Sequence, residues 1–228
     1  MAFYTGGIII VGWELRMGLT LQEIAKHVGR PIDTACNLIE NILSVPTSKL
    51  GDLLGDCVSY WQWRNRLNIV EKASEKLKRK GRPPCELPLD FAVPFLRDCG
   101  DTEDRNLQEW WAEMLSSAIV DEQFRHVAFV GILKSLSGAD IRFLDTLLDI
   151  GHVEKKGRIE AVAVASGLSP AQCRVSFNNL YRLGFFSPTG RRLTGFAFDF
   201  LRASCPHRER VDKYRDKQSK LRPLAVMD

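Results

Sequence analysis

The side chains best suited to bind another molecule lie together in residues 172–192. Arginine, asparagine and glutamine donate hydrogen bonds to base edges and phosphate oxygens, so their spacing on a single predicted helix and the turn after it is informative. The candidate nucleic-acid-binding residues are Gln172, Arg174, Asn178, Asn179, Arg182, Arg191 and Arg192. If this face is exposed and basic, it predicts binding to nucleic acid. If it packs against the rest of the chain, the segment is structural.

No spacing in the chain assembles an enzyme site. The sequence has no G-x-x-x-x-G-K-[ST] loop, no G-x-S-x-G turn and no H-E-x-x-H pair. Asp52 and Asp56 stand four residues apart and would share a helix face near Arg64 and Arg66. Such a pair could bind a metal or transfer protons, but a salt-bridged helix surface looks the same. We therefore expect no catalytic residue, no metal and no cofactor.

Residues 138–205 are predicted to form the elements that position the candidate residues, in the order helix, helix, helix, wing, helix. The second helix ends in a tight turn at Gly167, where glycine can adopt a positive φ. Ser169 and Pro170 suit the start of the third helix. Residues 185–194 indicate two short strands around a Pro-Thr-Gly turn. Apolar residues at helical spacing are Ile141, Leu144, Leu147 and Leu148 in the first helix, and Val175, Leu180 and Leu183 in the third.

The residues before position 137 are predicted to be helical. Apolar periodicity indicates helices over about residues 49–80, 87–99, 107–119 and 123–136. Trp110 and Trp111 lie on a broad apolar face, which predicts that they belong to the core. Residues 19–43 have Ala25 and Gly29 four apart, which gives a weaker prediction of a second helix-turn-helix; an ordinary helical hairpin is the alternative.

The composition is that of an ordinary globular protein. The chain has 228 residues, of which 45% are hydrophobic and 26% charged, with a formal net charge of +4. It contains neither an apolar run long enough to span a membrane nor a secretory signal, so we expect a cytoplasmic protein. The six cysteines include no C-x-x-C pair and the four histidines form no cluster with them, which favours reduced, buried thiols.

Positive charge is concentrated after residue 201. Residues 202–222 contain eight basic residues and three acidic ones, Glu209, Asp212 and Asp216. This segment is predicted to be a basic helix or a disordered arm. Most basic segments of this kind are charged chain ends in contact with solvent. The basic residues are Arg202, Arg208, Arg210, Lys213, Arg215, Lys217, Lys220 and Arg222.

The order and spacing of several segments resemble the abortive infection alpha family over about residues 48–205. The resemblance implies a bacterial phage-defence or mobile-element setting, and it supplies no catalytic residues. The segments that carry it are residues 50–56, 64–66, Gly81, Pro88, 94–96, 101–104, 107–115, 129–140, Leu193, Thr194, Gly195 and Phe198.

Together these observations predict a mainly α protein. A helical domain over residues 1–136 precedes a winged helix-turn-helix domain with a short β wing over 137–205 and a basic tail over 206–228. The expected function is a non-enzymatic phage-defence protein whose winged helix binds duplex nucleic acid, or else a protein partner or a second copy of the chain. One alternative is a DNA-binding transcriptional regulator with a helical dimerisation module. The other is a membrane-acting effector that uses the apolar residues 6–11, although a membrane partner is not expected.

Overall fold

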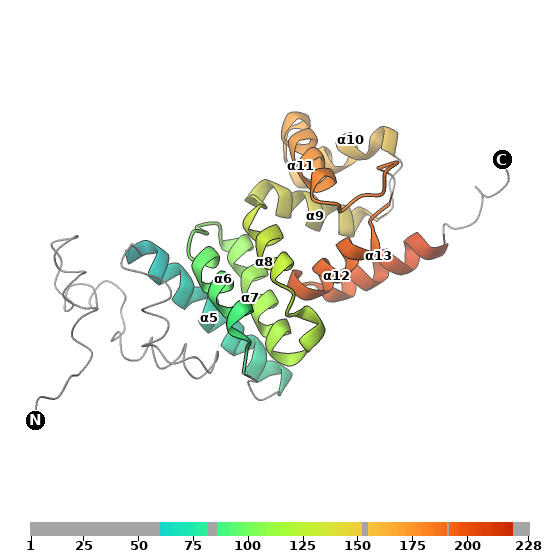
Figure 1. Ribbon diagram of the computed structural model, residues 1–228. Helices are drawn as coiled ribbons and strands as arrows, with labels where there is room; N and C mark the ends of the chain where they lie inside the picture. The colour runs from blue at the N-terminus through green and yellow to red at the C-terminus, as the bar shows by residue number, and fades with distance from the viewer. Residues whose placement is uncertain (1–59, 82–85, 152–154, 191, 221–228) are drawn as a thin grey trace, which may run out of the picture. The chain divides into compact units, whose positions relative to one another are not determined.

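The computed structural model describes residues 60–81, 86–151, 155–190 and 192–220, and these residues are mainly helical (Figure 1). They group into two compact units. Unit 1 contains the described residues up to 103 together with 115–130, and unit 2 contains 104–114 together with those from 131 onward. The candidate helix-turn-helix at 19–43, the apolar residues 6–11, and Asp52 and Asp56 lie outside the described residues.

Unit 1 is built on α5 (Tyr60–Lys80) and α6 (Leu89–Cys99). As predicted, α6 begins after Pro88 and ends at Gly100. The helix α7 (Arg105–Val120) contributes its last residues to this unit, followed by the short 3₁₀ helix η1 (Glu122–Phe124) and the start of α8 (Val127–Lys134). The sequence predicts one helix over 123–136, whereas the structure has η1 followed by α8, which is shorter than the predicted helix. The buried apolar residues of α5 and α6 are Leu67, Ile69, Val70, Ala73, Leu77, Phe91, Ala92, Phe95 and Leu96.

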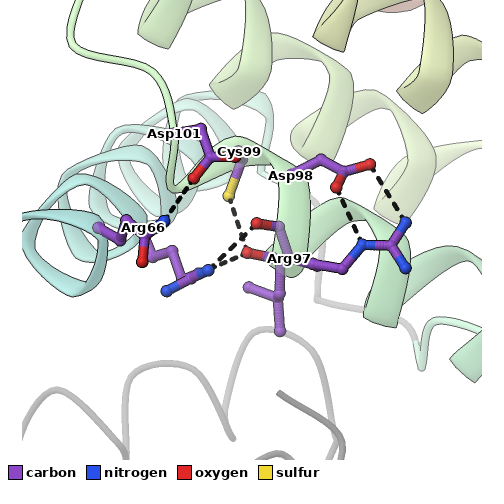
Figure 2. Close-up of polar contacts among 7 residues, drawn as sticks. Arg66, Arg97, Asp98, Cys99 and Asp101 are labelled. Atoms are coloured by element: carbon purple, nitrogen blue, oxygen red, sulfur yellow. Dashed lines mark hydrogen bonds and ion pairs between the residues drawn. The ribbon is translucent and has the colours of Figure 1, made fainter. Parts of the chain in front are cut away.

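A buried arginine joins α5 to the C-terminal end of α6 (Figure 2). The guanidinium of Arg66, only 2% exposed, donates hydrogen bonds to the backbone carbonyls of Leu96 and Arg97. The last carbonyls of a helix have no partner within the helix, so these bonds satisfy acceptors that would otherwise be buried alone. Burial lowers the pKa of Arg66, against the attraction of Cys99, Asp101 and Asp98. The arginine therefore acts as a side-chain cap for α6.

Unit 2 contains five further helices: α9 (Gly138–Ile150), α10 (Lys155–Ser166), α11 (Pro170–Arg182), α12 (Gly195–Ser204) and α13 (Arg208–Lys220). The first three correspond to the predicted sequence of three helices, and α9, α10 and α11 all pack on one another. Gly167, between α10 and α11, has the expected positive φ of 70°.

The first half of α7 supplies the two tryptophans of unit 2. Trp110 and Trp111 are 1% and 0% exposed, which confirms that both belong to the core. The Trp110 ring lies 6.4 Å from that of Phe200 on α12. Glu113, one turn after Trp110, pairs with Arg208 of α13 at 3.8 Å. The N-terminal half of α7 is thus tied to the C-terminal helices of the same unit.

Residues 185–187 and 192–194 pair as the two sides of a hairpin between α11 and α12. An isolated antiparallel bridge joins Phe186 to Leu193, and no strand extends from it in the described part of the chain. Ser187 N donates to Arg192 O at 2.8 Å, and Thr194 N donates to Phe185 O at 2.9 Å. The turn itself, with Gly190 at a φ of 68°, occupies most of the segment, so few residues remain to pair.

The basic segment after residue 205 is a docked helix as far as Lys220. Helix α13 buries Val211 and Tyr214 and packs against α12 and α9. Of the two forms predicted for this segment, the helix is therefore the one found over Arg208–Lys220.

Candidate nucleic-acid interface

Helix α11 carries most of the candidate residues, and its start is well defined. Ser169 caps it: the Ser169 hydroxyl accepts from Gln172 N at 3.2 Å, and the Gln172 side chain accepts from Ser169 N at 2.9 Å. This reciprocal pair is a capping box, and Pro170 occupies the first turn as predicted. The buried side of the helix consists of Cys173, Ser176 and Leu180.

The opposite side of α11 is exposed and mixes basic, amide and aromatic side chains. Arg174, Asn178 and Arg182 are exposed, as a binding role requires. Val175 was predicted to be an apolar position of this helix, but it is 69% exposed. The helix buries its small residues Cys173 and Ser176 beside Leu180, so the prediction was wrong for Val175 and is confirmed for Leu180. Tyr181, which was not among the candidates, is 43% exposed on the same helix.

The side-chain amide of Asn179 is hydrogen-bonded within the fold. Its half-buried side chain donates to Ser135 O at 3.1 Å and to Asp140 Oδ2 at 3.0 Å. Asp140 is the residue that completes the capping box of α9 with Ser137. Asn179 therefore fastens α11 to the N-terminal end of α9. Its Oδ1 also accepts from Arg182 Nη2 at 3.0 Å, which orients the Arg182 guanidinium.

The remaining candidates differ in their surroundings. The exposed Gln172 side chain takes part in the capping box. Arg192 is half-exposed in the hairpin, and Arg191 lies outside the described residues. The structure thus places Arg174, Asn178 and Arg182 on an exposed surface, and it gives Asn179 and Gln172 local structural bonds.

The hairpin is fastened to α11 and to α10. Tyr181 Oη donates to Pro188 O at 3.0 Å, and the Phe177 and Phe186 rings lie 4.8 Å apart. From α10, the buried Arg158 donates to Gly190 O, and its guanidinium lies 5.4 Å from the centre of the Phe186 ring. Burial lowers the pKa of Arg158. The hairpin therefore has a definite position beside α11 despite its single bridge.

The charge of this region is unusually one-sided. Residues 161–198 contain no Asp or Glu, and their only charged side chains are the four arginines 174, 182, 191 and 192. Removing these four from the 32 basic residues of the chain leaves 28, which equals the 28 acidic residues. The formal net charge of +4 therefore matches the charge of α11 and the hairpin. A segment with basic side chains and no acidic ones of its own attracts a polyanion.

The described thiols are buried and weakly acidic. Cys99, Cys173 and Cys205 are free and buried, as predicted for these three residues. Burial raises the pKa of Cys99 and of Cys205 to about 12. Such thiols carry almost no thiolate near neutral pH, so they are poor nucleophiles. Among the described residues, no group of three or more His, Cys, Asp or Glu side chains is placed to hold a metal ion.

The exposed tyrosine is the functional candidate that sequence reasoning missed. Tyr181 lies three residues after Asn178 and seven after Arg174, so the helical spacing that selected those residues also places Tyr181 on their side of α11. Its aromatic character alone would equally suit the core. The missing signal was the register of the buried face, which small residues define here.

No helix in the described part of the chain is long and apolar enough to cross a membrane.

Neither a curated protein nor a solved structure matches the chain. A family model described as abortive infection alpha matches residues 63–224. The match begins after residues 50–56, which were part of the expected resemblance, and it extends through α13. Because it covers more than half of the sequence, the chain belongs to the abortive infection alpha family.

Proposed function

We propose that this protein is a non-enzymatic bacterial phage-defence protein whose residues 137–205 act as a winged helix that binds duplex nucleic acid. Membership of the abortive infection alpha family supports the defence setting. The observation that carries the binding proposal is the exposed side of α11, with Arg174, Asn178 and Arg182, in a region free of acidic residues. In this proposal α11 is the recognition helix and the hairpin is the wing.

The chemistry of the surface suits a duplex. Arginine and asparagine side chains form bidentate hydrogen bonds to base edges in the major groove, and arginines also neutralise phosphates. Arg182 is oriented by Asn179, so less conformational freedom is lost when it binds. Arg192 of the hairpin, and Arg191 next to it in the sequence, would contact phosphates beside the groove.

The non-enzymatic part of the proposal comes from the sequence, in which no nucleophile–base pair, metal-ligand set or phosphate loop can be assembled. It is tested with Asp52→Asn and Asp56→Asn in a phage-protection assay. We expect both variants to protect as well as the wild type. Loss of protection in correctly folded protein, together with a divalent metal bound to the wild type, would overturn this part.

A protein partner is the second candidate for the same domain. Val164 on α10 and Val175 on α11 are 88% and 69% exposed, and a protein partner that covered them would remove apolar surface from water. A transcriptional regulator would use the same nucleic-acid surface with a different output.

Binding is tested by fluorescence anisotropy with duplex DNA, single-stranded DNA and duplex RNA over a salt series. Arg174→Gln combined with Arg182→Gln should weaken duplex binding and reduce the slope of log affinity against log salt by about 2, because each phosphate contact contributes about 0.9. The control is Arg105→Gln combined with Arg142→Gln, which removes the same charge from exposed positions of unit 2.

The two double variants separate the possible outcomes. The proposal predicts a large loss in the α11 variant and a small one in the control. Equal losses would mean that only net charge matters. No duplex binding by the wild-type protein would refute the proposal and favour the protein partner.

A further inference from the structure

The outer edge of the hairpin is bonded by a side chain from the last helix. Gln218 of α13 accepts a hydrogen bond from Leu193 N at 3.0 Å and donates one to Leu193 O at 2.9 Å. These backbone groups point away from the partner segment of the hairpin, so they are the groups that a third strand would pair. One glutamine amide offers the same donor and acceptor as a peptide unit.

The hairpin needs support of this kind. Its two segments share a single bridge, at Phe186 and Leu193, and an isolated two-stranded hairpin is marginally stable in water. Arg158 fastens the turn by donating to Gly190 O. Gln218 fastens the returning segment at the bridge residue itself.

Gln218 is in turn held by its helix. Tyr214 and Val211, one and two turns earlier on α13, are 2% and 0% exposed, and α13 packs on α12 and α9. The Gln218 side chain is half-buried. Its amide therefore reaches Leu193 from a fixed support and not from a loose end of the chain.

We propose that Gln218 is a positioning residue for the hairpin: it takes the place of a third strand and fixes the backbone next to Arg192. For its binding consequence this inference rests on the proposed function. A hairpin already fixed in place loses less conformational entropy when it contacts phosphates, so Arg192 binds with a smaller cost. Helix α13 thereby belongs to the binding domain, although it carries none of the candidate contact residues.

The test uses the full chain with Gln218→Met, which has a similar length and no amide. Gln123→Met is the matched control, since Gln123 is an exposed glutamine of η1 in unit 1. Amide hydrogen exchange at Leu193 should become about two- to tenfold faster in Gln218→Met, the range expected for the loss of one hydrogen bond. Duplex affinity should fall about threefold, and the salt slope should decrease by up to about 1, because Arg192 loses its fixed position.

Each readout can overturn the inference separately. Unchanged exchange at Leu193 would show that Gln218 does not hold the hairpin. Faster exchange with the wild-type affinity and salt slope would show that the bonds serve stability alone. If the wild-type protein binds no duplex, the proposed function fails together with the binding role of Gln218, and the exchange result alone decides whether α13 fixes the hairpin. Equal changes in Gln123→Met would also count against it.

Discussion

Two neighbouring asparagines on α11 have different surroundings. Asn178 is exposed, while Asn179 donates to Ser135 O and to Asp140 Oδ2. The sequence predicts both as binding residues because residue type does not reveal which side of a helix faces its own unit. Only the direction of the side chain separates an exposed amide, which a ligand could reach, from one that serves the fold.

This difference gives a prediction with an internal control. Asn179→Ala should lower the free energy of unfolding by about 1 kcal/mol, because it removes the hydrogen bonds between α11 and the start of α9. Asn178→Ala should leave the free energy of unfolding within about 0.5 kcal/mol and weaken duplex binding instead. Urea unfolding and anisotropy on both variants measure the two effects. The reverse assignment would show that the face of α11 has been misidentified.

Gly100, next to the Arg66 cap, allows a second prediction. A Cβ at Gly100 would lie 2.8 Å from Arg66 Cζ, closer than two carbons can approach. Gly100→Ala should therefore push the guanidinium away from the carbonyls of Leu96 and Arg97 and cost about 1–3 kcal/mol. Gly131→Ala is the control, since nothing lies within 4 Å of that Cβ position. Equal urea midpoints for the two variants would mean that Arg66 moves aside without cost.

At the scale of elements, local chemistry predicts the helix starts well. The capping boxes at Ser137 and Ser169 each fix the first residue of a helix, and the signals that predict them are short-range. The hairpin is different. Its turn is encoded by Pro188 and Gly190, but the bonds that hold it come from Arg158 and Gln218, which are distant in sequence. No periodicity reveals such partners, so the number of paired residues could not be predicted.

The cap of α11 can be tested as an element. Ser169→Ala removes the acceptor for Gln172 N and should lower the free energy of unfolding by about 1 kcal/mol. Ser169→Asp should stay close to the wild type, because aspartate caps helices as well as serine does. Thermal melts and urea midpoints compare the three proteins. If alanine and aspartate destabilise equally, the hydroxyl serves some role other than capping.

At the scale of the whole molecule, the two units share one electrostatic property. Each contains a buried thiol, Cys99 in unit 1 and Cys205 in unit 2, whose pKa is raised to about 12. Burial also raises the pKa of Tyr214 in unit 2. An unfolded cysteine has its ordinary pKa of about 8.5–9, so the folded protein keeps a proton at alkaline pH that the unfolded chain releases.

The sign of the pH dependence follows from this difference. Between about pH 9 and pH 12 the native state binds more protons at these thiols than the unfolded state, so the free energy of unfolding falls as pH rises. Below pH 8 both states are protonated and the thiols add no pH dependence. Each thiol can contribute a slope of up to about 1.4 kcal/mol per pH unit in that window.

Cys99→Ala and Cys205→Ala should therefore each flatten the decline of stability between pH 9 and pH 11, even if both variants are less stable at pH 7. The comparison of slopes, obtained from urea unfolding at several pH values, cancels the contribution of lysines and other groups that titrate in the same range. The double variant should be flatter than either single one, because the thiols lie in different units. Cys205→Ala should retain a residual decline from Tyr214, whose pKa is raised in the same unit. Parallel curves for the wild type and the double variant would show that the thiols ionise as easily in the folded protein as in the unfolded chain.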